Sequence, residues 1–250
     1  MGINIKSDKE IESMRKGGKI LAKVLELVME NAVAGISTKE LDAMAEDFII
    51  KNGGKPGFKG YGGFPATLCT ARNEVIVHGI PHKDDILQEG DIFTADCGVI
   101  YEGFNTDAAR SKGIGKVSPL KQKLLDTSKR ALSETIDLIK PGLPLNEIGK
   151  NIEKIVNAAG FKIIHDLTGH GIGRKLHESP HILNYYDGKP GPLLKAGMTL
   201  AIEPIFSAST HNMVTLKDGW TLATEDKSPS VQEENTILVT QNGCEILTQV

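Results

Sequence analysis

The sequence has few cysteines, and they show no pairing pattern. Three occur among the 250 residues, at Cys69, Cys97 and Cys244. An odd number without C-x-x-C spacing predicts neither a disulfide framework nor a cysteine-based zinc site. We therefore expect a protein of a reducing compartment, the cytoplasm.

Long apolar runs and an excess of positive charge are also missing. No uninterrupted apolar stretch approaches the roughly 20 residues of a membrane-spanning helix, and the N-terminal residues do not form a signal peptide. Lysine and arginine number 29 against 32 aspartate and glutamate, a formal net charge of −3. Without a basic excess to neutralise phosphates, we expect no DNA partner, and without an apolar run no membrane partner.

Signals for helix starts and stops are clear in four places. Capping boxes at 7–10 and 37–40 each precede apolar residues at helical spacing, and Gly53 follows the second helix. Ser118-Pro119 predicts an N-cap with proline at the first helical position, for a helix that runs to Lys140. A fourth helix follows from about residue 145 and is closed by Gly160.

These features form an internal repeat. Several recur 107 positions apart, namely Gly35 with Gly142, Gly53 with Gly160, and 87–90 with 194–197. The strand-like segments that follow place an acid, Asp96 or Glu203, at the same spacing. The repeat predicts a single catalytic domain over residues 1–250, made of two α+β halves (about 8–115 and 118–250) with a site at their seam.

Acidic side chains converge on this seam. Alternation along 92–96 and a tight turn at 101–103 bring Asp107 nearly opposite Asp96. Two carboxylates this close repel each other, and Glu203 and Glu234 add two more acids from the second half. About four negative charges would therefore meet, and two divalent cations would neutralise them. Mostly oxygen ligands with one imidazole suit Mn, Fe, Co or Zn better than a metal that prefers thiolates.

Five segments resemble the type I methionine aminopeptidases over nearly the whole chain. They are Asn73–Pro81 (NEVIVHGIP), Asp96–Asp107 (DCGVIYEGFNTD), Gly169–Pro180 (GHGIGRKLHESP), Thr199–Pro204 (TLAIEP) and Glu234–Thr240 (ENTILVT). The resemblance implies an α+β pita-bread fold, with two pseudo-symmetric halves, a central antiparallel sheet and flanking helices. It also implies a metalloaminopeptidase, a hydrolase that removes the N-terminal methionine from nascent proteins.

The resemblance further implies a ligand set for two divalent ions (Co, Mn, Fe or Zn). The ligands would be Asp96, Asp107, His170, Glu203 and Glu234. By the family's pattern Asp107 and Glu234 bridge the ions, Asp96 belongs to one ion, and His170 and Glu203 belong to the other.

We expect a water shared by the two ions to attack the first peptide carbonyl. His78 and His177, which match the family's two non-ligand histidines, would bind the peptide and stabilise the developing charge. Glu203 would move a proton towards the leaving amine.

A loop rich in glycine and aromatic residues, Gly57–Cys69, matches the family's pocket for the methionine side chain. The pocket residues implied by position are Phe58, Tyr61, Phe64, Cys69, Leu176 and Trp220. An apolar pocket with aromatic walls would favour a thin, polarizable thioether. The expected partners are nascent polypeptide N-termini, with the ribosome as a candidate docking site, and we expect a monomer.

Other interpretations of the sequence lead to different proteins. The string His177–His181 satisfies H-E-x-x-H, but Pro180 disfavours the helix that a zinc-protease motif requires. Prolidase and aminopeptidase P would share the five ligands, although they usually carry an extra N-terminal domain for which about 60 residues before the pocket loop leave no room. A non-catalytic binding module is a third alternative. Nucleotide binding at 113–116 or 169–173 is disfavoured because neither string completes a phosphate-loop pattern.

Overall fold

The computed structural model describes residues 2–249. These residues form four α-helices, α1 (Asp8–Asn31), α2 (Thr38–Lys51), α3 (Pro119–Ile136) and α4 (Asn146–Ala158), and one short 3₁₀ helix, η1 (Tyr61–Gly63). Among them, no helix combines the length and apolar character needed to cross a membrane.

The predicted helix starts are confirmed. The backbone N–H of Ser7 donates to Glu10 at 2.8 Å, and that of Ser37 donates to Glu40 at 2.9 Å, so both capping boxes form. The predicted end of α3 at Lys140 is wrong, because the helix ends at Ile136. The next residues tighten into turns with i→i+3 hydrogen bonds, and a proline at 141 excludes helical geometry for the residue before it.

The strands pair antiparallel in four sheets. The first half contributes β1 (Lys55–Pro56), β2 (Leu68–Arg72), β3 (Val75–Val77), β4 (Ile92–Tyr101) and β5 (Phe104–Gly113). The second contributes β6 (Lys162–Ile163), β7 (Thr168–Gly171), β8 (Glu178–Leu183), β9 (Thr199–Ile202), β10 (Ile205–Ser207), β11 (Met213–Thr215), β12 (Leu222–Thr224), β13 (Ser230–Gln232), β14 (Asn235–Val239) and β15 (Cys244–Ile246). The sheet orders are β1-β4-β2 with β5 beside β4, β13-β10-β6, β11-β12-β3, and β15-β14-β9-β7-β8.

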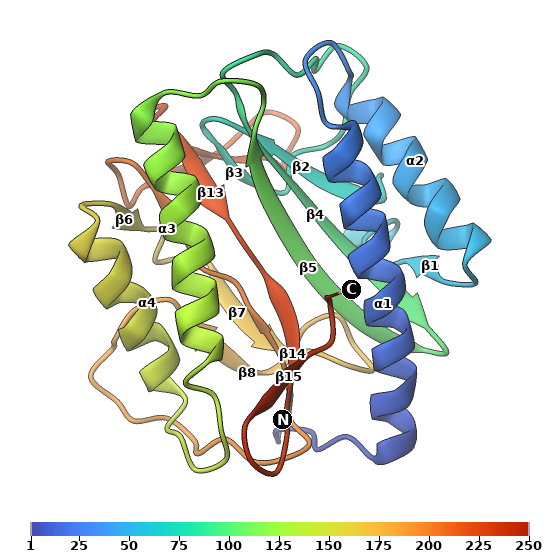
Figure 1. The fold of residues 1–250 in the computed structure, drawn as a ribbon, viewed down its shortest axis with the longest axis vertical. Helices are drawn as coiled ribbons and strands as arrows, with labels where there is room; N and C mark the ends of the chain where they lie inside the picture. The colour runs from blue at the N-terminus through green and yellow to red at the C-terminus, as the bar shows by residue number, and fades with distance from the viewer. Residues whose placement is uncertain (1, 250) are drawn as a thin grey trace.

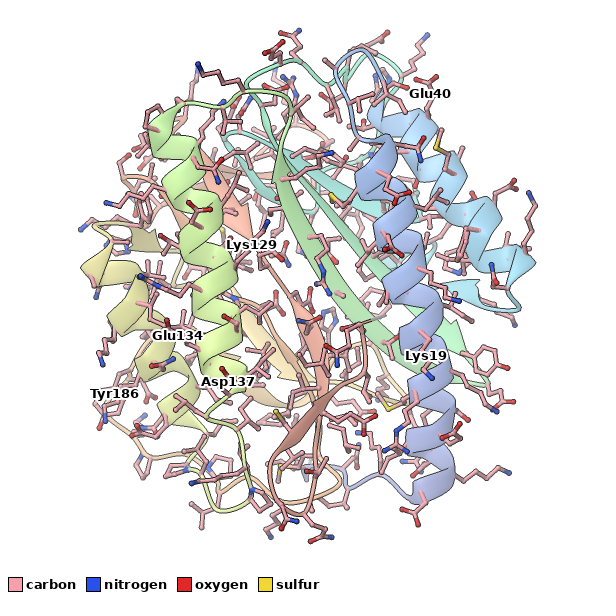
Figure 2. All side chains as sticks on the ribbon, in the orientation of Figure 1. Lys19, Glu40, Lys129, Glu134, Asp137 and Tyr186 are labelled. Carbon is pink, nitrogen blue, oxygen red and sulfur yellow. The ribbon has the colours of Figure 1, made fainter. Side chains whose placement is uncertain are left out.

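The helices cover one face of the strands. In Figure 1, α1 lies against the β4–β5 hairpin with α2 beside it, next to β1 and β2. On the other side α3 lies against β13 and β5, and α4 contacts β6 and β8. Each pair of helices buries an apolar core against its own strands, one with Leu21, Leu41 and Phe93, the other with Leu132, Ile152 and Phe206. Lys19 on α1 and Lys129 on α3 are exposed on the helical face (Figure 2).

The repeat appears as matching backbone hydrogen bonds. The N–H of Gly35 donates to Leu87 at 2.8 Å, and 107 positions later that of Gly142 donates to Leu194 at 2.9 Å. The two loops that precede α2 and α4 therefore make the same backbone contact, as pseudo-symmetric halves would, although Ser37 caps α2 and α4 has no side-chain cap.

The hairpin β4–β5 sets the register of the first two acids. Glu102 and Gly103 both have positive φ (48° and 84°), which is typical of the two-residue turn that matches strand twist. Asp107 pairs with Gly98, and Asp96 pairs with Ala109. The two acids share one face but lie on a diagonal, two positions away from the directly opposed arrangement.

Candidate metal centre and substrate pocket

One cavity of about 310 Å³ gathers every site residue that the sequence indicated. Its lining includes the five candidate ligands, both candidate peptide-binding histidines, and all six pocket residues: Asp96, Asp107, His170, Glu203, Glu234, His78, His177, Phe58, Tyr61, Phe64, Cys69, Leu176 and Trp220. Both halves of the chain therefore contribute to a single site.

The seam between the halves positions the acids. Asp96 and Asp107 come from β4 and β5, whereas Glu234 lies between β13 and β14. The backbone N–H of Glu234 donates to the carbonyl of Ala109 at 3.0 Å, which joins the second half directly to β5. Since Ala109 is the ladder partner of Asp96, this bond brings the three carboxylates to one place.

Three candidate ligands form the centre of the cluster. One ligand atom each from Asp107, His170 and Glu234 lies within 4.8 Å of the others, and all three residues are buried. Glu203 follows β9, and its Oε1 lies 3.5 Å from Nε2 of His170. The Nδ1 of His170 contacts the carbonyl of Gly171 at 2.9 Å, which leaves Nε2 free to act as a ligand.

Burial and mutual repulsion act together on the carboxyl groups. Burial raises the pKa of Asp96 to about 7. The pKa values of Asp107, Glu203 and Glu234 are also raised well above their ordinary values, first by burial and then by the charges of neighbouring acids in the cluster. Burial likewise lowers the pKa of His170 to about 4, so its imidazole is neutral near pH 7.

The donor set fits divalent cations. Oδ1 of Asp96, Oδ1 of Asp107 and Oε1 of Glu234 are buried without a hydrogen-bond partner among the described residues. Buried polar atoms normally have partners, and ionised ones require compensation. Cations among these oxygens and the neutral imidazole would supply the missing interactions and offset the repulsion.

Gln232 and Arg110 form hydrogen bonds that hold the acids in place. Nε2 of Gln232 reaches Asp96 Oδ2 at 3.4 Å and Glu234 Oε2 at 3.3 Å. The partly buried guanidinium of Arg110 donates to the carbonyls of Glu234 at 2.5 Å and Thr248 at 2.9 Å. The sequence interpretation missed these residues. For Gln232 the signal is its spacing of two from Glu234, which places both side chains on one face of an extended chain.

The two non-ligand histidines reach the cavity from opposite halves. His78 follows β3 with a φ of 58°, and a Cβ on Gly79 would lie 1.9 Å from the Thr70 carbonyl oxygen, so only glycine fits there. Nδ1 of His177 lies 2.9 Å from the hydroxyl of Tyr61, and its ring centroid lies 4.4 Å from that of His170. Removal from solvent, and then a neighbouring histidine, lower the pKa of both rings.

An apolar pocket adjoins the acids. Phe58, Phe64, Cys69 and Leu176 are buried in one cluster, and Phe64 meets Trp220 edge to face at 5.3 Å between ring centroids. Buried Asp42 of α2 accepts the backbone N–H groups of residues 67 and 68 at 2.8 and 3.0 Å, which fixes the end of the pocket loop.

The sequence interpretation left other lining residues unassigned. These are Val77, Asp166, Leu167, Thr168, His181, Ile205 and Gln232. His181 pairs with His170 across the β7–β8 ladder, and nothing in its sequence context distinguished it from a surface histidine. The H-E-x-x-H string is not helical, as predicted, since Glu178–Leu183 forms strand β8.

Comparison with known proteins identifies the family to which the chain belongs. Residues 12–241 match the model of metallopeptidase family M24, and the chain belongs to this family, whose members are hydrolases. Within the family it belongs with the methionine aminopeptidases. It is 44% identical over 248 residues to the methionine aminopeptidase of Clostridium acetobutylicum, with 98% of each chain covered. It is 41% identical over 249 residues to that of Escherichia coli K12, with 99% of this chain and 94% of the relative covered.

Solved structures confirm the expected fold. The crystal structure of methionine aminopeptidase from Thermotoga maritima matches with a TM-score of 0.98 at 40% identity and covers all of both chains. Prolidase from Pyrococcus furiosus matches with a TM-score of 0.81 at 26% identity, and this chain covers 65% of its length. The predicted pita-bread fold is therefore correct.

Proposed function

We propose that this protein removes the N-terminal methionine from nascent proteins and peptides, using two divalent cations. One observation carries the proposal: four carboxylates and a neutral imidazole converge beside an apolar pocket, and three of the carboxylates have buried oxygens without partners among the described residues. The similarity to methionine aminopeptidases over the full chain supports methionine as the residue removed.

Asp96, Asp107, His170, Glu203 and Glu234 would hold the cations. Asp107 and Glu234, which with His170 form the compact part of the cluster, would contribute oxygen ligands at its centre. The donor set, rich in oxygen with one imidazole, favours Mn, Fe, Co or Zn. When bound, the cations would supply Lewis acidity and lower the pKa of a water molecule at the site.

The chain's own residues would orient the peptide. The imidazoles of His78 and His177, both neutral near pH 7 because their pKa values are lowered, would hydrogen-bond the scissile peptide and stabilise charge on its carbonyl oxygen. Glu203, at the edge of the cluster beside His170, would carry a proton towards the leaving amine.

The apolar pocket would hold the methionine side chain. Phe64 and Trp220 form one aromatic wall, and Leu176 and Cys69 contribute smaller apolar surfaces. Such a pocket accepts an unbranched thioether and excludes water from the reacting bond. A substrate seated there would present its first peptide bond to the acids.

We further propose where and in what form the protein acts. Its three cysteines are free thiols, which suits the reducing cytoplasm. Nascent N-termini, met at the ribosome, are the proposed partners. The two halves, about 8–115 and 118–250, would form one catalytic domain that works as a monomer.

A peptide assay tests the function against its nearest rival. The protein loaded with Mn or Co should release methionine from Met-Ala-Ser and leave Xaa-Pro peptides intact. Preferential cleavage of Xaa-Pro bonds would instead indicate a prolidase-like enzyme of the same fold. Two bound metals without turnover on either peptide would favour a non-catalytic binding module.

A further inference from the structure

Lys6 is a buried cation that does not line the cavity. Its Nζ lies 2.7 Å from Oε2 of Glu178, and the two side chains are 1% and 4% exposed. The partners are 172 positions apart in the sequence. Glu178 directly follows His177, which is a proposed peptide-binding residue. The ion pair therefore joins the N-terminal segment to the loop that carries His177.

Two glycines of the second half, at positions 173 and 197, contact Lys6. A Cβ on Gly173 would lie 2.3 Å from Cε and 2.8 Å from Nζ of Lys6, so a larger residue at 173 would move the end of the lysine side chain from this position. The backbone N–H of Lys6 donates to the carbonyl of Gly197 at 2.8 Å. The N-terminal segment thus passes between two glycines of the second half.

Glu178 uses both carboxylate oxygens to fix the loop 173–178. Oε1 accepts the backbone N–H of Lys175 at 3.0 Å, and Oε2 accepts Nδ2 of Asn4 at 3.1 Å as well as Lys6. Burial alone would raise the pKa of Glu178, but the hydrogen bonds from Lys6, Asn4 and Lys175 hold it below its ordinary value. The carboxylate therefore stays ionised, and it holds the loop backbone at Lys175.

The loop carries two residues that face the cavity. Leu176 is buried in the apolar pocket, and His177 is exposed to the cavity with Tyr61 as its side-chain hydrogen-bond partner. The ring of His177 contacts Tyr61 and His170 on the cavity side, and its direction also depends on the backbone on either side of it. Glu178 fixes that backbone immediately after the histidine.

We propose that Lys6 is a positioning residue, which holds Glu178 so that loop 173–178 directs the His177 imidazole at the substrate peptide. This role of Lys6 rests on the function proposed above for His177. It also gives the glutamate of the H-E-x-x-H string a structural role in this fold instead of that of a base.

Kinetics of Lys6→Met test the role. Methionine keeps the length of the stem and removes the charge, so we expect kcat on Met-Ala-Ser to fall about tenfold or more, with KM changed less and metal content unchanged. Lys9→Met, an exposed lysine in the first turn of α1, is the matched control and should leave kcat as it is. An unchanged kcat in Lys6→Met would overturn the proposal.

A double-mutant cycle separates positioning from general support of the fold. If Lys6 acts through His177, Lys6→Met should cause no further loss in a His177→Ala background. If Lys6→Met lowers kcat by the same factor in both backgrounds, the proposal is overturned and the proposed function is unaffected. If Lys6→Met folds poorly because Glu178 is left unpaired, Lys6→Met/Glu178→Gln removes both charges and should show the same loss of kcat.

Proton NMR of the imidazoles gives a readout that needs no turnover. In Lys6→Met the His177 signal should shift, whereas the signal of exposed His82, which lies outside the cavity, should not. An unmoved His177 signal would refute the role of Lys6 even in a protein without peptidase activity. Absence of methionine release from wild-type protein together with a shifted signal would refute only the proposed function.

Discussion

The hydroxyl of Thr236 bridges the backbone of Asp107. Its Oγ1 accepts the N–H of Asp107 at 2.9 Å and donates to the carbonyl of the same residue at 2.8 Å. Thr236 lies on β14 of the second half and Asp107 on β5 of the first. One buried side chain therefore ties β5, which carries Asp107, to β14, which begins directly after Glu234.

Thr236→Val should weaken both the fold and the metal site. The exchange leaves a buried N–H without a partner, so we expect the free energy of unfolding to fall by about 2 kcal/mol and metal affinity to fall about 10- to 100-fold. Thr236→Ser keeps the hydroxyl and is the control. Denaturant unfolding and metal titration measure the two effects. Equal metal affinity in the valine and serine variants would contradict the proposed coupling.

His78→Ala should separate binding of metal from catalysis. Since His78 is not among the candidate ligands, its loss should leave the metal content intact while kcat on Met-Ala-Ser falls about 10²- to 10³-fold, as for other donors to a developing oxyanion. His82→Ala, outside the cavity, should be unaffected. Unchanged turnover in His78→Ala would remove this residue from the mechanism.

Trp220→Ala should impair recognition of the methionine side chain. The exchange removes one wall of the pocket together with the edge-to-face contact between Trp220 and Phe64, an aromatic pair worth about 0.5–1.5 kcal/mol. We therefore expect KM to rise several-fold. Exposed Tyr186 does not line the cavity, and Tyr186→Ala is the comparison variant. Steady-state kinetics on Met-Ala-Ser measure the effect. A fall in kcat at constant KM would contradict a role in side-chain binding.

Removal of metal should expose the electrostatic cost of the acid cluster. In the metal-free protein burial raises the pKa of Asp96 to about 7, and the other three acids are raised as well. The folded state then binds protons more tightly than the unfolded state, so stability falls as pH rises from the ordinary carboxyl pKa of about 4 through 7.

The stabilisation gained on metal binding should therefore grow with pH. His170, whose pKa burial lowers to about 4, acts in the opposite sense below the ordinary histidine pKa of about 6.5, so the comparison belongs between about pH 6.5 and pH 8. Differential scanning calorimetry with and without Mn should give a larger difference in Tm at the upper end. A difference independent of pH would mean that the acids are not compensated by the metal.

Local sequence signals predicted much of the fold. Capping boxes placed the starts of α1 and α2, and the recurrence of glycines at a constant spacing predicted two similar halves. The start of each helix depends on side chains a few residues away, which a sequence displays directly. The end of α3 was predicted four residues too late, because a proline shows where a helix must stop but not where packing ends it earlier.

The candidate site was predictable where chemistry and spacing coincide. Acids on alternating strands and the resemblance to a known family indicated the five candidate ligands, the two peptide-binding histidines and the six pocket residues that line the cavity. They did not indicate other lining residues such as Gln232 and His181. The sequence did not predict the diagonal offset of Asp96 and Asp107. This offset depends on the register of the β4–β5 hairpin, which is set by the residues that form the first pair after the turn. Contacts such as Arg110 with Thr248 and Lys6 with Glu178 join distant segments and arise only from tertiary packing.

The most direct test is a titration of chelator-treated protein with Mn or Co, following release of methionine from Met-Ala-Ser. We predict no activity after chelation, and a return of activity that is complete at two equivalents of metal per chain. Full activity in the metal-free protein, or no release of methionine when two metals are bound, would contradict the account.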